Sequence, residues 1–116
     1  MNEPYDNLHA RLYPEVAAKQ EYIICAAIYC QDNKVHREQP SNIKTGFVVC
    51  GRRHSDVFAL LEALGVKFKD YSEEKLKDGF ITSKNRFVDR FEAAQVANKA
   101  GQLRKPLDWL QSEELY

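Results

Sequence analysis

Residues 21–30, EYIICAAIYC, constrain the fold of this chain more than any other segment. After the first glutamate every side chain is apolar or aromatic, so a strand formed here would have no face suited to water. Isoleucine and tyrosine favour extended structure, because branched and aromatic side chains pack well on a pleated surface. The segment therefore predicts a strand at the centre of a sheet.

Further strand and turn signals follow along the chain. QDNK at 31–34 is rich in turn residues and predicts a hairpin into VHREQP. Apolar runs predict the other strands: TGFVVCG at 45–51, GFITS at 79–83 and, after a turn at KNR, a short return strand in FVD. The charged residues 66–78 predict an exposed connection that includes one helical turn.

The clearest helix is predicted over residues 55–64. Ser55 can cap its N-terminus, and Gly65 supplies a C-terminal stop. The apolar residues that share one face at helical spacing are Val57, Leu60, Leu61 and Leu64. This face should pack against the sheet.

A second helix is predicted over residues 89–101. Asp89 and Glu92 have the spacing of a capping box. Small side chains line one face, at Ala93, Val96, Ala97 and Ala100. Such a face allows close approach, either to the sheet or to another subunit.

Together these elements predict an α+β fold in a single domain, residues 1–116, with a small, mostly antiparallel sheet packed against two principal helices. Residues 1–20 form an N-terminal extension in which Pro4 and Pro14 interrupt any long helix. Residues 102–116 should dock on the domain, because they carry large apolar side chains at Leu107, Trp109, Leu110, Leu115 and Tyr116.

The charge balance excludes some partners. The 17 basic and 17 acidic residues cancel, whereas proteins that hold long nucleic acid through many phosphates carry a basic excess. No apolar run reaches the ~20 residues of a membrane span, and the N-terminal sequence lacks a signal-peptide core. We therefore expect a cytosolic protein without membrane or long nucleic-acid partners, in which a few arginines could still serve a small anion.

Catalysis and metal binding find little support in the sequence. Cys25, Cys30 and Cys50 lie in apolar, strand-like runs without paired spacing, so we expect reduced core thiols. The three histidines are scattered and show no metal-ligand spacing. We expect no catalytic residue, no metal and no cofactor, and the chain reads as a binding protein.

The segment VVCGRRHSD at 48–56 is the best candidate for anion binding. Arg52, Arg53 and His54 lie between a buried strand and a helix N-terminus, which offers unpaired N–H groups and a partial positive charge. Two arginines there are unfavourable unless an anion lies beside them, and guanidinium groups match phosphate oxygens. The alternative is that both side chains are simply solvated.

A second group of candidates lies in GFITSKNRFVDR at 79–90. Thr82, Asn85, Arg86 and Phe87 combine a hydroxyl, an amide, a guanidinium and a ring, the groups that recognise nucleotides. An ordinary asparagine turn followed by a core phenylalanine explains the same residues. Arg104 follows a helix C-terminus, where a cation is favourable in any case.

These segments, with the terminal SEELY, resemble a family of small phage and prophage proteins, the first described class of anti-Thoeris sponge proteins. The resemblance covers roughly residues 21–116 and is weakest over 31–44 and 66–78. It implies a protein that encloses glycocyclic ADP-ribose, the signal of a bacterial immune enzyme, without cleaving it. It also implies the cytoplasm of the infected host, a dimer or hexamer, and cyclic di- or trinucleotides of CBASS immunity at a separate site.

The resemblance also assigns roles to residues. The phosphate-gripping arginine would be Arg52 or Arg53, with a second basic contact at Arg104. Asn85 would supply an amide contact, and Thr82 would belong to the separate cyclic-oligonucleotide site. The base-stacking ring would be Phe87, Phe68 or Tyr71. Two other classes of function remain open: an inhibitor that acts by protein contact, and a small nucleotide-processing enzyme.

Overall fold

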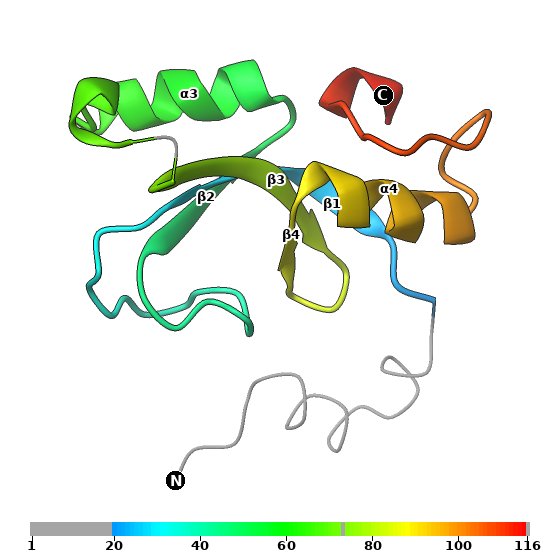
Figure 1. Cartoon of the computed structure of the whole chain (residues 1–116), viewed down its shortest axis with the longest axis horizontal. Coiled ribbons are helices and arrows are strands. Elements are labelled where there is room, and N and C mark those ends of the chain that lie inside the picture. The colour runs from blue at the N-terminus through cyan, green and yellow to red at the C-terminus, as the bar shows by residue number, and fades with distance from the viewer. Residues whose placement is uncertain (1–19, 73, 116) are drawn as a thin grey trace, which may run out of the picture.

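The sheet of this protein is antiparallel, with the strand order β2-β1-β3-β4. The structure is a computed structural model that describes residues 20–72 and 74–115. Helices α3 and α4 both pack on the same face of the sheet (Figure 1), since alternate residues of β1 belong to the cores beneath each helix. The predicted α+β fold is confirmed.

Strand β1, Ile23–Cys30, lies inside the sheet as predicted. It pairs with β2, Phe47–Gly51, on one side and with β3, Leu76–Thr82, on the other. The short return strand is β4, Phe87–Val88. Strand β3 begins three residues before the predicted position, so part of the charged connection is strand.

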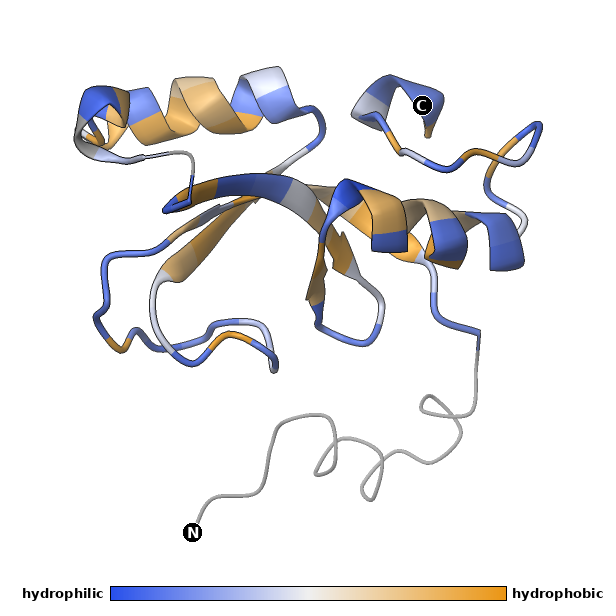
Figure 2. Cartoon of the chain, in the orientation of Figure 1, coloured by the Kyte–Doolittle hydropathy of each residue, from blue (hydrophilic) through white to orange (hydrophobic). Residues whose placement is uncertain are grey.

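The hairpin predicted from residues 31–40 does not form. Residues 31–46 form a loop without any strand, and β1 pairs with β2 instead. Val35 is the only large apolar residue of VHREQP and is 82% exposed, so this segment has no apolar face to bury. The loop is mostly hydrophilic, whereas apolar residues concentrate in the strands and in parts of the two helices (Figure 2).

Helix α3, His54–Ala63, begins one residue before the predicted start. Its N-cap is Arg53 rather than Ser55, and no side chain caps it. Val57 and Leu61 are buried, but Leu60 and Leu64 are exposed, so the predicted apolar face is wrong in half of its members. The helix instead turns the 54, 57, 58 and 61 side chains toward the sheet.

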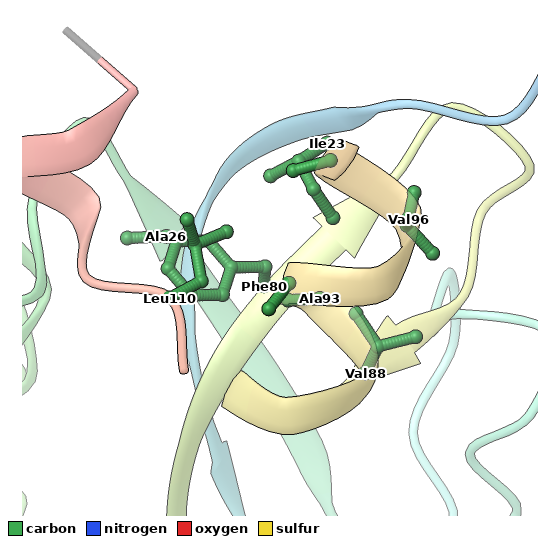
Figure 3. Packing of buried hydrophobic residues seen from close by; sticks show 9 residues of the cluster. Ile23, Ala26, Phe80, Val88, Ala93, Val96 and Leu110 are labelled. Atoms are coloured by element: carbon green, nitrogen blue, oxygen red, sulfur yellow. The ribbon is translucent and has the colours of Figure 1, made fainter. Parts of the chain in front are cut away.

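Helix α4, Arg90–Lys99, has the predicted cap: the Asp89 carboxylate accepts a hydrogen bond from the Glu92 backbone N–H at 2.8 Å. Its small residues are buried against Ile23 and Phe80 of the sheet (Figure 3). The face that could have served another subunit is therefore used within the chain. The helix does not by itself indicate an oligomer.

The C-terminal segment lies across α4 and contributes to the same core. Leu110 is completely buried, and its backbone N–H donates to the Arg90 carbonyl oxygen at 3.1 Å. The Asn98 amide bonds both backbone polar groups of Leu107. A short 3-10 turn, η2 (Ser112–Glu114), then brings the chain toward the N-terminus of α3 (Figure 1).

The cysteines differ from the prediction. Cys30 is buried, Cys25 is half-buried, and Cys50 is exposed, because it lies on an edge strand and faces away from the helices. All three are free thiols, as expected. Among the described residues, no helix has the length and apolarity that crossing a membrane requires.

Candidate functional site

Several hollows border the C-terminal segment. The first, which we call the tail pocket, has a volume of about 670 Å³ and is lined by residues from 102–107 and 113–115. The second, the helix-face groove, has a volume of about 430 Å³ and lies between Phe58 of α3 and Phe91 of α4. It adjoins a hollow of about 340 Å³ that reaches His54 and Glu113 and shares three lining residues with it, Asp78, Arg90 and Trp109.

Glu113 borders the tail pocket and this adjoining hollow. Its carboxylate Oε1 lies 3.8 Å from Nη1 of Arg53, the N-cap residue of α3. The helix N-terminus adds a partial positive charge at the same place. The sequence predicted an anion beside the two arginines. In the structure the Glu113 carboxylate lies beside Arg53.

Arg104 and Lys105 line the tail pocket together with Glu113. The C-terminal segment thus places Glu113 beside Arg53 and in the same pocket lining as the 104–105 pair. Arg52 is exposed, whereas the Arg53 side chain is only 25% exposed. Of the two adjacent arginines, Arg53 is the one that faces this region.

An exposed aromatic pair borders the helix-face groove. The rings of Phe91 and Trp109 meet edge to face with their centres 4.6 Å apart, and they remain 57% and 45% exposed. The Arg90 guanidinium carbon lies 5.7 Å from the centre of the Trp109 ring. Arg90 is held in place, because it donates to the Leu110 carbonyl oxygen at 2.8 Å and to Asp78 at 3.1 Å.

His54 is part of the core rather than of the groove surface. Its Nε2–H donates to the Gly79 carbonyl oxygen at 2.7 Å, and its ring packs edge to face on Phe80. Burial lowers the pKa of His54 below its ordinary value, although the hydrogen bond to Gly79 opposes this. This arrangement favours a neutral His54 imidazole, which supports β3 through its contacts with Gly79 and Phe80.

Thr82 and Arg86 converge on a carboxylate at the start of β1. Glu21 accepts bonds from the Thr82 hydroxyl at 2.6 Å and from Nε and Nη2 of Arg86, each at 2.9 Å. Arg86 also donates to Glu92 at 3.1 Å. The bonds from Arg86 outweigh burial and hold the pKa of Glu21 below its ordinary value, and they raise the pKa of Arg86. This cluster joins β1, the β3–β4 turn and α4.

A polar hollow of about 480 Å³, the hairpin pocket, adjoins this cluster. Its cations are Lys84, Arg86 and Lys99. Asn85 lies in the same turn in a left-handed conformation, with φ of 58°, and its backbone carbonyl accepts bonds from Ser41. Asparagine tolerates the left-handed conformation of this turn, which explains the presence of Asn85 at this position.

The three aromatic residues expected to stack on a base are all engaged in packing. Phe68 meets Phe58 edge to face at 5.4 Å, and Tyr71 packs on the same core cluster. Phe87 is 9% exposed and meets Tyr29 at 5.7 Å. None of them borders the groove or the tail pocket.

The candidate residues therefore form separate groups. Arg53, His54 and Arg104 lie around the C-terminal segment, whereas Thr82, Asn85, Arg86 and Phe87 lie at the β3–β4 hairpin. Phe68 and Tyr71 lie in the connection that follows α3. The sequence could not place these groups, because contacts between distant segments set them.

Sequence reasoning missed Arg90, Phe91, Trp109 and Glu113 as site residues. The signal available was Trp109, the only tryptophan of the chain, in a tail with an expected docking role. Within residues 20–72 and 74–115, no cluster of three or more potential ligands could hold a metal ion. The arrangement suits recognition of an anion and a flat ring.

Comparison with protein families matched residues 22–116 to the phage T4 y16D protein family. The comparisons with curated proteins and with solved structures gave no match. The matched segment includes every strand and both helices of the described fold as well as the C-terminal segment. This chain belongs to the phage T4 y16D protein family.

Proposed function

We propose that this phage protein binds a small cyclic ADP-ribose-type nucleotide and sequesters it without cleaving it. The ligand class follows from the resemblance to anti-Thoeris sponge proteins, whose signal is glycocyclic ADP-ribose. Membership of a phage protein family is consistent with such an anti-defence role. The binding region is the tail pocket with the adjoining end of the helix-face groove.

The observation that carries the proposal is that Glu113 pairs with Arg53 at 3.8 Å and also lines the tail pocket, whose cations are Arg104 and Lys105. The Glu113 carboxylate beside Arg53 supports the proposal that an anion is favourable at this place. A diphosphate carries more negative charge than a carboxylate. Charge-assisted hydrogen bonds to arginine contribute about 1.5–3 kcal/mol each. Arg53, Arg104 and Lys105 would bind the phosphates once Glu113 moves aside.

The aromatic pair supplies the second part of the affinity. A sponge must compete with an effector for the same signal, so we expect a dissociation constant at the nanomolar level, near −12 kcal/mol. A few phosphate contacts do not reach this value after the entropy of association is included. Stacking on Trp109 would add about 1–3 kcal/mol.

A cyclic oligonucleotide would occupy a different place. The hairpin pocket is separate from the tail pocket and carries Lys84 and Lys99 beside the buried Thr82. Titration with a cyclic dinucleotide and a cyclic trinucleotide, in protein already saturated with the first ligand, tests this part. Binding that is unaffected by the first ligand supports two sites.

The main experiment is calorimetric titration of the full chain with cyclic ADP-ribose and with glycocyclic ADP-ribose, followed by heat denaturation and chromatography of the released ligand. Tight binding with full recovery of intact ligand supports sequestration. An altered ligand would identify an enzyme instead. Arg37→Ala is the matched control, since Arg37 is an exposed arginine of the 31–46 loop outside every hollow described above.

The second candidate function is inhibition by direct protein contact. Four large apolar side chains are exposed on the helix side of the molecule: Leu60, Leu64, Phe91 and Trp109. Absence of nucleotide binding in the titration, with a partner captured from host cells through these residues, would favour this function. The oligomeric state, for which we expect a dimer or hexamer, is measured by light scattering.

A further inference from the structure

The face of the sheet opposite the helices carries two cysteines that the proposed nucleotide site does not use. Cys50 of β2 is the register partner of Ala27 of β1. Side chains alternate along a strand, so Cys25, two residues before Ala27, lies on the same face as Cys50 and diagonally next to it. The two side chains are close enough for each thiol to affect the pKa of the other.

The two sulfurs have different roles in this pair. The interaction between the two thiols lowers the pKa of Cys50 and raises that of Cys25. Cys50 is exposed, so a small oxidant can reach it. A thiolate that is accessible and stabilised by a donor is the form of cysteine that reacts with oxidants.

Cys30 provides an internal comparison. It lies on the helix side of β1, within the core beneath α3, and is completely buried. Burial raises its pKa to about 11. The Cys25–Cys50 pair and the buried Cys30 therefore lie on opposite faces of the sheet.

The sheet allows the pair to close with a small movement. Diagonal neighbours in a sheet have Cα atoms about 7–8 Å apart, slightly beyond the range of about 4.4–6.8 Å in disulfides. Strand β2 has a neighbour on one side only, and the register of β1 against β3 shifts between Ile23 and Cys25. Because β2 is an edge strand and the ladder of β1 is irregular beside Cys25, we expect the two Cα atoms to be able to approach by the roughly 1 Å that a disulfide requires. A bond closed in this way is strained and is therefore readily reduced.

We propose that Cys50 is a peroxide-reactive thiol and that Cys25 is its resolving partner, so that oxidation joins β1 to β2 by a reversible intramolecular disulfide. The Cys50 thiolate attacks one oxygen of hydrogen peroxide, the O–O bond breaks, and Cys50 sulfenic acid and water form after protonation. The Cys25 sulfur then attacks the sulfenic sulfur. The S–O bond breaks, and the departing hydroxide takes the Cys25 proton to leave as water. Two thiols lose two electrons in total, and one peroxide becomes two waters.

The test uses the reduced full chain treated with equimolar hydrogen peroxide, then intact mass measurement and peptide mapping without reductant. We expect the monomer to lose two hydrogens, a cross-link between the peptides that contain Cys25 and Cys50, and complete reversal by dithiothreitol. Cys30→Ser is the matched control and should behave like the wild type. In Cys25→Ser, Cys50 should stop at the sulfenic acid, which dimedone traps.

Labelling rates provide a test that needs no variant. In the native protein, iodoacetamide should modify Cys50 on the order of tenfold or more faster than Cys30. The proposal is overturned if the oxidised wild-type monomer retains both hydrogens, if the cross-link includes Cys30, or if only intermolecular disulfides form. Equal labelling rates for Cys50 and Cys30 would also contradict it.

Discussion

The side-chain amide of Asn42 pairs with both backbone polar groups of Phe87. Its Nδ2 donates to the Phe87 carbonyl oxygen at 2.7 Å, and the Phe87 N–H donates to its Oδ1 at 2.9 Å. Phe87 belongs to the edge strand β4, so the amide takes the place of a further strand. At the other edge, Gln39 accepts the Val48 N–H at 2.8 Å. The 31–46 loop thus covers backbone groups at both edges of the sheet.

Asn42→Ala should destabilise the fold by about 1–3 kcal/mol. The substitution removes two hydrogen bonds. The partly buried N–H and carbonyl groups of Phe87 then have only water as a hydrogen-bond partner in place of Asn42. Urea denaturation of the variant and the wild type measures the difference. Lys44→Ala, an exposed change in the same loop, should stay within about 0.5 kcal/mol of the wild type. Equal stability of all three proteins would show that the loop contributes nothing at this edge.

Gly79→Ala should be strongly destabilising, by about 3 kcal/mol or more. A Cβ at Gly79 would lie 2.1 Å from the Val88 carbonyl oxygen and 2.7 Å from the Phe87 ring, so the β3–β4 pair would have to separate. Gly65→Ala is the comparison, because its Cβ would meet open space and only its φ of +87° opposes the change. Thermal unfolding should rank Gly79→Ala well below Gly65→Ala, and the reverse order would contradict the packing described here.

The stability of the protein should fall between pH 7.5 and pH 5.5 because of His54. Burial lowers its pKa below 6.5 in the folded state, so the unfolded chain takes up the proton first. The contribution of the neutral ring is complete above about pH 6.5 and is lost as the pH falls toward the folded-state pKa.

Urea denaturation at the two pH values measures this loss. His54→Gln should reduce the dependence, since glutamine can still donate to Gly79 but does not titrate. His36→Gln leaves the His54 contribution in place and serves as the control. A variant at position 54 with the same pH dependence as the wild type would assign the effect to another group.

The sequence was sufficient to predict most of the fold. The apolar segment at 21–30 predicted β1, and the capping box at Asp89 and Glu92 predicted the start of α4. The secondary-structure prediction failed where contacts between distant segments, rather than the local sequence pattern, determine the backbone conformation. Residues 31–46 contain turn residues that favour a hairpin, but they are held instead by bonds to β2, β4 and Lys75.

The candidate site was less predictable than the fold. Helical spacing alone could not show that Leu60 and Leu64 turn outward, because the position of the sheet decides which part of an apolar stripe is buried. The same limitation hid Glu113. Its place beside Arg53, 60 positions earlier, exists only because Leu110 anchors the tail in the core beneath α4.

Trp109→Ala should weaken binding of cyclic ADP-ribose by about tenfold to a hundredfold. This loss corresponds to about 1–3 kcal/mol of stacking, and the exposed indole lines the same hollow as Glu113, the residue that pairs with Arg53. Trp109→Phe should retain part of the affinity, since it keeps a ring at that position. Calorimetry on both variants, with circular dichroism to verify folding, measures the effect. Full affinity in Trp109→Ala would show that the indole does not stack on the ligand.

Arg53→Ala should weaken the same ligand far more than Arg52→Ala. Successive side chains at the end of a strand point to opposite sides, and Arg53 pairs with Glu113 whereas the Arg52 side chain is exposed. Loss of a charge-assisted contact is expected to cost about 1.5–3 kcal/mol, roughly tenfold to more than a hundredfold in affinity. Arg37→Ala should bind like the wild type.

Glu113→Gln provides the complementary test of the same contact. The carboxylate competes with the ligand phosphate for Arg53, so its neutral replacement should strengthen binding. The gain should diminish at high salt, because Glu113 is 64% exposed and its interaction with Arg53 is screened. Isothermal titration at low and high ionic strength measures both effects. Weaker binding in Glu113→Gln would mean that the carboxylate helps to hold the ligand, and that the phosphates lie elsewhere than beside Arg53.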